Sequence, residues 1–332
     1  MKCTNRCIHT ISFLVCFALT CTLLTGCGTP AYDMPYDTNY GVSSYRINVT
    51  SSSERAKSFA ADLCVSDANV VSNPQLDVES ASAVGLFNLK SGQTIYGKNL
   101  YTRLAPASLT KIMTALVALK YGSADQILTA SDQVVIKESG AQLCGIKPGD
   151  QMTLNQALHI LLIYSANDVA ILIAEGIAGS VDAFCALMNK EAAALGATGS
   201  NFVNPNGLTA DDHYVTAYDM YLIFNEAMKY DLFNEIIQTP SYTTIYTLAN
   251  GDSKEITVNN TNRYLRDNAT PPELITIIGG KTGTTATAGH CLILLSRDST
   301  GNPYISIILK SDSSDNLYLQ MSNLLEEINR QN

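Results

Sequence analysis

The chain lacks tryptophan, has only four histidines, and carries fewer basic than acidic residues, 21 against 30, over 332 positions. Its formal net charge is −9. Such a balance argues against a broad surface for nucleic acid or anionic lipid, because those partners need clustered positive charge. No nucleic-acid partner is expected, and any anionic ligand must be held by a local basic site.

The chain also lacks a C-x-x-C pair, and its histidines are isolated along the sequence. Since metal sites need grouped Cys, His or acidic side chains, no metal and no cofactor are expected. Five of the nine cysteines lie in the first 27 residues. The other four allow three disulfide pairings, which the sequence leaves open; we expect most of them to be small buried apolar residues. They are Cys64, Cys144, Cys185 and Cys291.

The N-terminal apolar run is too short to span a membrane. It covers 11–24, "ISFLVCFALTCTLL", whereas a spanning helix needs about 20 residues. Lys2 and Arg6 precede it, and "LTGC" places small residues before Cys27. This pattern is similar to a bacterial lipoprotein signal in 1–26, with Cys27 lipidated. An ordinary secretory signal and an uncleaved anchor are the alternatives, and each of the three exports the chain. With the lipid on Cys27, the protein is expected at the extracytoplasmic face of the bacterial cell membrane.

Residues 27–78 are rich in Ser, Asn, Asp and Tyr and show no sustained periodicity, which predicts a flexible tether behind the lipidated cysteine. A flexible chain of about 50 residues has an end-to-end distance of roughly 40 Å. The tether would hold a folded domain, predicted over 79–332, away from the membrane.

The domain opens with a hairpin pattern, "SAVGLFNLKSGQTIYGKN", and an apolar helix that stops at Gly122. From about 150 to 230 the patterns are helical. Strand patterns then return in "SYTTIYTL", "ELITII", "HCLILLS" and "YISIILK", before a C-terminal amphipathic helix. Strands at both ends of a helical block predict an α/β fold of the α+β type. It would be an antiparallel sheet built from distant segments and flanked by helices, with an inserted all-helical subdomain.

Three short motifs carry candidate chemistry. The first is "ASLTK", in which Ser108 and Lys111 share one helix face. A serine becomes a nucleophile when a base takes its proton, and a lysine in an apolar setting can lose its own proton and act as that base. A chance S-x-x-K is the alternative for this motif taken alone.

The second motif is "YSAND", where Ser165 and Asn167 interrupt an apolar helical run and need polar partners. A simple helix–helix turn is the alternative. The third is "GGKTGTT", which offers the charge of Lys281 and the hydroxyls of Thr282 and Thr284 beside glycines that permit close approach. Such a strand could pair with an extended peptide. A glycine-rich hairpin loop is the alternative.

Together the motifs are far more specific than each alone. S-x-x-K and K-T-G, with S-D-N between them, are the signature set of penicillin-binding proteins and class A β-lactamases, and the middle motif of this chain is S-A-N. The chain resembles the low-molecular-mass serine-type D-alanyl-D-alanine carboxypeptidases of bacteria from about Ala83 to Lys310, including "KPGD" and "NPNGLTADDHYVTAYDM". The resemblance implies a β-lactamase/transpeptidase-like fold. It also implies removal of the terminal D-Ala from peptidoglycan stem peptides ending in D-Ala-D-Ala, and inhibition by β-lactam antibiotics.

The resemblance also implies roles for single residues. Ser108 would be the acylated nucleophile, Lys111 its proton acceptor, and Ser165 a proton relay to the leaving amine. The backbone N–H groups of Ser108 and Thr284 would form the oxyanion hole, in which one donor is worth about 3–4 kcal/mol in a comparable enzyme.

The remaining roles concern the substrate. Asn167 would bind the peptide amide, and Lys281 would support Ser165 and the field around the terminal carboxylate. Thr282 and Thr284 would hydrogen-bond that carboxylate, while Gly283 would let the substrate backbone approach.

Two other functions use the same motifs. A class A β-lactamase needs a glutamate after its S-D-N motif to activate water, and the corresponding stretch here, "LGATGSNFVNPNGL", has no acidic residue. We therefore expect a penicillin target and not an enzyme that destroys penicillin. A non-catalytic module that binds wall peptides is the other alternative.

One departure from the family affects the carboxylate end of the predicted site. Many relatives place an arginine after the last core strand, but the stretch "KSDSSDNLY" has none. His290 follows the K-T-G motif closely, and we expect it to be a strand residue without a catalytic role.

Overall fold

The protein is described by a computed structural model that covers residue 60 and residues 63–331. The predicted signal segment 1–26, the lipidation site Cys27 and most of the predicted tether lie outside the described residues.

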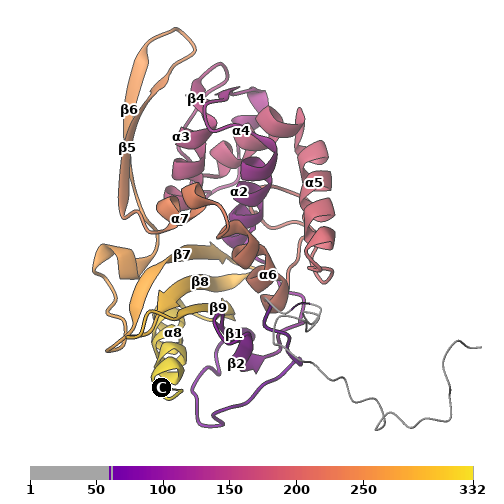
Figure 1. Ribbon diagram of the computed structural model, residues 1–332. Coiled ribbons are helices and arrows are strands. Elements are labelled where there is room, and N and C mark those ends of the chain that lie inside the picture. The colour runs from indigo at the N-terminus through magenta and orange to yellow at the C-terminus, as the bar shows by residue number, and fades with distance from the viewer. Residues whose placement is uncertain (1–59, 61–62, 332) are drawn as a thin grey trace, which may run out of the picture. The chain divides into compact units, whose positions relative to one another are not determined.

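Five antiparallel strands form the main sheet, in the order β2-β1-β9-β8-β7 (Figure 1). The first two strands pair directly, and the N-terminal β1 pairs with the C-terminal β9. The prediction of a sheet built from distant segments is therefore confirmed. The strands are β1 (Ala83–Asn88), β2 (Gln93–Lys98), β7 (Thr276–Thr285), β8 (Gly289–Arg297) and β9 (Pro303–Ser311).

The central strands are apolar on both faces because both faces of the sheet are covered. Along β8, Cys291, Ile293 and Leu295 join the core beneath the helical block, whereas Leu292 and Leu294 pack toward helix α8 (Ser314–Asn329). Strand side chains alternate between faces, so a continuous apolar run is what a doubly covered strand needs. Each fully buried aliphatic side chain contributes about 1.5–3 kcal/mol of transfer free energy.

The helical block lies above the sheet in Figure 1, and α8 covers the opposite face. The apolar "KIMTALVAL" segment forms the central helix of this block and ends before Gly122, as predicted. Interruption of the helical run at "YSAND" is also confirmed, between α3 and α4. The helices are α2 (Thr110–Tyr121), α3 (Leu154–His159), α4 (Asn167–Ala178), α5 (Val181–Ala194), α6 (Ala217–Ala227) and α7 (Asp231–Ile237).

A second sheet has the order β3-β4-β5-β6, and the sequence patterns predicted only one of its strands, β5, at "SYTTIYTL". Its last two strands form the long hairpin at the left of Figure 1, paired from Ser241 with Asn259 to Thr247 with Ser253. Two of the strands are only three residues long, too short for a recognisable alternation. The strands are β3 (Ile127–Thr129), β4 (Gln151–Thr153), β5 (Ser241–Thr247) and β6 (Ser253–Asn259).

The predicted start of the domain at residue 79 is too late. Cys64 is buried, and its backbone N–H donates to the hydroxyl of Tyr221 at 2.8 Å. Val70 exchanges backbone hydrogen bonds with Gly97 of β2. Residues 63–78 are therefore part of the folded domain and not of a tether, because paired backbone and a buried side chain fix them on the sheet.

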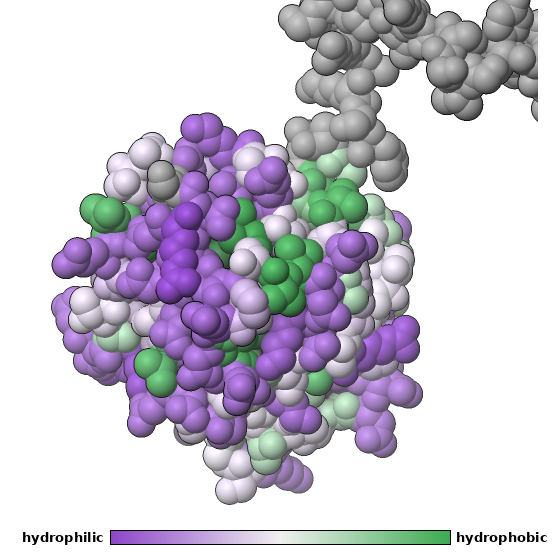
Figure 2. All heavy atoms as spheres, turned by 90° about the horizontal axis from the view of Figure 1, so that it is seen from below, coloured by the Kyte–Doolittle hydropathy of each residue, from purple (hydrophilic) through white to green (hydrophobic). Residues whose placement is uncertain are grey.

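Figure 2 shows the face that lies below in Figure 1; polar side chains cover most of it, with small separate apolar groups between them. Among the described residues, no single helix has the length and apolar composition of a membrane span. The consecutive helices α4 and α5 meet those criteria only as a pair, with a bend of 83° between them.

Candidate active site

A cleft of about 590 Å³ runs along the edge strand β7, between the sheet and the helical block. All eight residues that the sequence singles out for the site meet there. Six line the cleft, namely Ser108, Ser165, Asn167, Thr282, Gly283 and Thr284. The other two, Lys111 and Lys281, are buried and reach the cleft residues through their ammonium groups.

Ser108 lies in a short 3-10 turn, η3 (Ala107–Leu109), that leads into α2. Ala107, directly before it, has a φ of +48°, a conformation that non-glycine residues rarely adopt. The Thr110 hydroxyl donates to the Ala107 carbonyl at 2.9 Å and so fixes this turn. Strained backbone persists where its surroundings hold it, and such positions cluster at active sites.

His213, which sequence reasoning missed as a site residue, supports the same turn. Its Nδ1 accepts from the Val203 N–H at 3.1 Å, so the ring proton is on Nε2, 2.9 Å from the Thr110 hydroxyl. Burial lowers the pKa of His213 to about 4 and keeps the ring neutral. Its contact with Thr110 joins residues 103 positions apart, so no local pattern could predict it. The only signal in the sequence was that His213 lies inside a segment shared with the family.

Lys111 is completely buried, and its Nζ has three oxygen neighbours. It lies 3.0 Å from Ser108 Oγ and 2.8 Å from Asn167 Oδ1, and it also contacts the backbone carbonyl of Asn206. Burial, and then the nearby charge of Lys281, hold the pKa of Lys111 well below its usual range. A neutral amine has two N–H donors for the two acceptor-only oxygens of Asn167 and Asn206, which leaves its lone pair for the Ser108 hydroxyl.

The second motif stands opposite Ser108 on an unusual backbone. A π-helical turn, η5 (Ile160–Tyr164), ends at Ser165, whose φ is +68°, and α4 begins at Asn167. Asp168 accepts the backbone N–H groups of Cys144 and Gly145 and ties the cleft-lining loop before them to this motif. The π turn therefore aims the Ser165 hydroxyl into the cleft and not along a regular helix.

Lys281 connects the K-T-G strand to this motif. Its Nζ lies 2.9 Å from Ser165 Oγ, and burial lowers the pKa of Lys281 to about 7. At neutral pH its ammonium and amine forms are both populated. The buried Lys281 and Ser165 side chains can therefore exchange a proton with a group in the cleft.

Gly283 has a neighbour that the sequence reasoning did not foresee. A Cβ at this position would lie 2.9 Å from Ser108 N and 3.1 Å from the Pro106 carbonyl oxygen. The glycine therefore lets the nucleophile turn of the same chain pack against β7. The expectation that it serves the approach of a substrate backbone stays a prediction.

The rest of the cleft wall beside β7 contains Thr261 and His290. The Thr261 and Thr282 hydroxyls lie 2.6 Å apart, and Thr284 Oγ1 lies 3.3 Å from His290 Nδ1. His290 is a strand residue of β8, as predicted, and it also lines the cleft.

The described part of the chain contains no group of three or more His, Cys, Asp or Glu side chains that could hold a metal ion. Its four cysteines are free thiols; Cys64, Cys185 and Cys291 are buried and Cys144 is half-buried.

The sheet, the helical block and the serine–lysine cleft define the class of penicillin-binding, serine-type acyl-transfer proteins. Comparison with solved structures agrees. The DD-transpeptidase of Streptomyces K15 superposes with a TM-score of 0.68 at 27% identity, over 75% of this chain and 96% of that one.

The family follows from sequence comparison. The profile of the D-alanyl-D-alanine carboxypeptidase family matches residues 67–313, and the chain belongs to this family. Carboxypeptidase DacF of Bacillus subtilis is 38% identical over 66% of this chain and 54% of its own length. Carboxypeptidase DacA of Escherichia coli K12 is 33% identical over 66% of this chain and 53% of its own length. The chain thus spans about half the length of these two relatives.

Proposed function

We propose that the protein is a serine DD-carboxypeptidase that removes the terminal D-Ala from peptidoglycan stem pentapeptides through an acyl-Ser108 intermediate. The observation that carries this proposal is the environment of Lys111. When this amine is neutral, its two N–H groups donate to the Asn167 and Asn206 oxygens, which only accept, and its lone pair is left for the Ser108 hydroxyl 3.0 Å away. This is the arrangement that a general base for a serine nucleophile requires.

In the first half-reaction the Ser108 proton passes to Lys111 as Oγ attacks the carbonyl carbon of the penultimate D-Ala. The backbone N–H groups of Ser108 and Thr284 would stabilise the oxyanion. Ser165, backed by Lys281, relays this proton from Lys111 to the leaving amine, and the C–N bond breaks to release D-alanine. Lys111, neutral again, takes a proton from the water that attacks the ester and returns it to Ser108 Oγ as the ester C–O bond breaks.

The same chemistry makes the protein a penicillin target, because the lactam carbonyl acylates Ser108 in place of the peptide. Among the described residues that line the cleft, Glu138 is the only acidic one, and it lies in the exposed loop before β4. No carboxylate contacts Lys111 or Ser108 in the hydrogen bonds of this site. A penicilloyl ester should therefore persist, in contrast to the rapid turnover of a β-lactamase. Complete loss of a fluorescent penicillin label within seconds would overturn this choice.

A product analysis tests the proposed activity. Purified full-length protein is incubated with muropeptides, and the masses of the products are followed with Ser108→Ala as control. Conversion of pentapeptide to tetrapeptide supports the carboxypeptidase. Split cross-links would indicate an endopeptidase, and new cross-links a transpeptidase. No change with wild type, together with equal peptide binding by the variant, would favour a non-catalytic binding module.

Export and anchoring through lipidated Cys27 form a separate proposal, supported by the N-terminal sequence pattern. The expected outcome is that wild type, expressed in a bacterial host, partitions into the detergent phase of a Triton X-114 extraction. Cys27→Ser is expected to partition into the aqueous phase if the signal is cleaved. Detergent partitioning of both proteins would indicate an uncleaved anchor, and aqueous partitioning of both a secretory signal.

A further inference from the structure

A side cavity adjoins the catalytic cleft at the base of the long hairpin of β5 and β6 (Figure 1). It has a volume of about 410 Å³ and shares two lining residues, Gln142 and Thr261, with the cleft. The Thr261 hydroxyl lies 2.6 Å from that of Thr282, the residue predicted to hold the terminal carboxylate of the substrate. That carboxylate belongs to the residue that leaves in the reaction. The side cavity therefore lies at the leaving-group end of the cleft.

One wall of the side cavity is the edge of a strand. Four consecutive residues of β6, from Ile256 to Asn259, line it. Because strand side chains alternate between two faces, a consecutive run lines a cavity through the edge of the strand. β6 is the last strand of its sheet, so its outer edge has no partner strand among the described residues.

The register of the hairpin shows which backbone groups of β6 point outward. The Asn260 N–H donates to the Pro240 carbonyl at 2.8 Å, so these two residues form a hydrogen-bonded pair. In antiparallel strands such pairs alternate with pairs whose N–H and C=O groups point away from each other. Asn259 and Thr257, one and three residues before Asn260, belong to the second kind. Their backbone N–H and C=O groups therefore face outward, on the edge that lines the side cavity.

The loop that forms another wall is held in place by the second motif of the active site. The Gln142 carbonyl accepts from the Asn167 N–H at 2.8 Å, and the Cys144 N–H donates to the Asp168 carboxylate at 3.0 Å. Gln142 and Cys144 both line the side cavity. This wall is therefore preformed, which lowers the entropy cost of binding a ligand.

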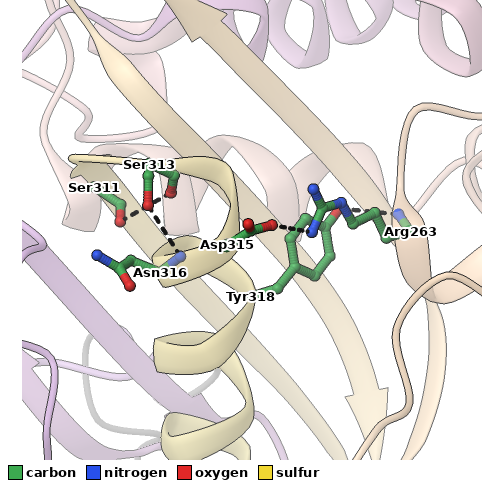
Figure 3. A network of polar contacts seen from close by, with 6 residues as sticks. All are labelled: Arg263, Ser311, Ser313, Asp315, Asn316 and Tyr318. Carbon is green, nitrogen blue, oxygen red and sulfur yellow. Dashed lines mark hydrogen bonds and ion pairs between the residues drawn. The ribbon is translucent and has the colours of Figure 1, made fainter.

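The third wall includes Arg266, at the end of the short 3-10 helix η6 (Arg263–Arg266). Figure 3 shows how this helix is fixed on α8. Arg263, which lines the catalytic cleft, donates its backbone N–H to the Tyr318 hydroxyl at 2.9 Å and its Nη1 to Asp315 at 2.8 Å. Its guanidinium carbon also lies 5.0 Å from the centre of the Tyr318 ring. Among the described residues that line the side cavity, Arg266 is the only charged one.

We propose that the protein also cleaves cross-linked peptidoglycan, and that the side cavity binds the second stem peptide as an added strand on the β6 edge. This inference rests on the proposed function. In a cross-link the leaving amine belongs to a side chain of a second stem peptide, so the leaving group continues past Thr282. Extended peptides bind free strand edges through main-chain hydrogen bonds. The carboxylates of a stem peptide also suit the positive charge of Arg266.

Cleavage of a cross-link uses the groups already described for the active site. Ser108 Oγ attacks the carbonyl carbon of the cross-linking D-Ala, and the C–N bond to the second stem peptide breaks. The released amine takes the proton that Ser165 relays, and water then hydrolyses the Ser108 ester. One cross-link and one water molecule give two separate stem peptides.

The test compares two purified muropeptides, a monomer ending in D-Ala-D-Ala and a cross-linked dimer of two tetrapeptides. Thr257→Pro removes an outward N–H and leaves the bonds between β5 and β6 intact, because proline is tolerated where an edge N–H faces away from the sheet. This variant should lower kcat/KM for the dimer about tenfold, since a hydrogen bond is lost. It should leave D-alanine release from the monomer unchanged.

Two controls match this variant. Glu255→Pro removes the next outward N–H of the same edge, at a residue outside the lining of the side cavity. Thr257→Val removes the hydroxyl that lies 2.8 Å from that of Thr243 and keeps the backbone N–H. Both controls should cleave the dimer like wild type. If Thr257→Pro does not fold, Asn259→Pro makes the same comparison at the other outward N–H.

The proposal is overturned if Thr257→Pro cleaves the dimer like wild type, if it loses equally on monomer and dimer, or if Glu255→Pro loses as much on the dimer. It is also overturned if wild type releases D-alanine from the monomer and leaves the dimer intact. A wild type that cleaves neither muropeptide would refute the proposed function, and this inference with it.

Discussion

Gly283→Ala is the substitution whose effect the structure defines most closely. The new Cβ would lie 2.9 Å from Ser108 N, 3.1 Å from Ala107 Cβ and 3.1 Å from the Pro106 oxygen. Carbon atoms pack best at about 3.5–4.0 Å, so β7 and the nucleophile turn must separate by about half an ångström. Both sides resist this shift, because β7 is paired with β8 and the turn is held through Thr110.

The two proposed oxyanion donors, the backbone N–H groups of Ser108 and Thr284, lie on opposite sides of this contact. Donors act at 2.7–3.1 Å from the oxyanion, and loss of one costs about 10²- to 10³-fold in kcat in a comparable enzyme. A half-ångström separation weakens one donor without removing it, so we expect kcat to fall about 10²-fold. Overpacking should cost about 1–3 kcal/mol of stability, and each kcal/mol lowers Tm by about 2–4 °C in a domain of this size.

The assay measures kcat on an acyl-D-Ala-D-Ala peptide, the rate of acylation by a fluorescent penicillin, and Tm. Gly97→Ala is the control, because its Cβ would meet the flexible Leu100 side chain at 2.8 Å, in β2 and away from the cleft. It should lose stability without losing kcat. Rates for Gly283→Ala equal to those of the control would refute the reasoning about the oxyanion hole.

Three further predictions concern the buried titratable groups. Neutral Lys111 is the active form, so the kcat/KM of wild type should rise with pH through a pKa well below 10.5. Lys111→Met should lower kcat/KM about 10²- to 10⁴-fold at all pH values. A wild-type kcat/KM that rises only above pH 10 would contradict this prediction. Lys281 has a pKa of about 7 in the folded protein and 10.5 in the unfolded chain, so the unfolded chain binds more protons between these pH values. In thermal melts, wild type should therefore gain stability relative to Lys281→Met as the pH rises from 7 to 10. His213 has a pKa of about 4 in the folded protein against an ordinary 6.5, so its contribution to stability should be lost as the pH falls from 6.5 to 4. In thermal melts, His213→Gln should make stability depend less on pH over this range. The same variant should lower kcat, because it loosens the turn at Ala107.

Much of the fold could be predicted because its signals are local. The apolar run in α2, the break at "YSAND" and the continuous apolar runs of strands β8 and β9 each depend on neighbouring residues. The motif residues could also be grouped into one site, since three motifs in a known order constrain one another. The structure brings all eight together.

Other features depend on contacts that no local pattern encodes. The left-handed Ala107 is held through Thr110 by His213, far along the chain, and Gly283 faces the nucleophile turn of its own chain. The second sheet includes two three-residue strands, which carry no periodicity. Arg263 comes from a connection between strands, so its place in the cleft follows from tertiary structure alone.

The most direct test of the account is to trap the acyl-enzyme. Full-length protein is mixed with a stem pentapeptide, quenched with acid during turnover, digested and mapped by mass spectrometry. We predict that the peptide containing Ser108 gains the mass of the tetrapeptide less one water, as one D-alanine is released, and that Ser108→Ala forms neither product. Release of D-alanine by the Ser108→Ala variant at the wild-type rate would contradict the central claim.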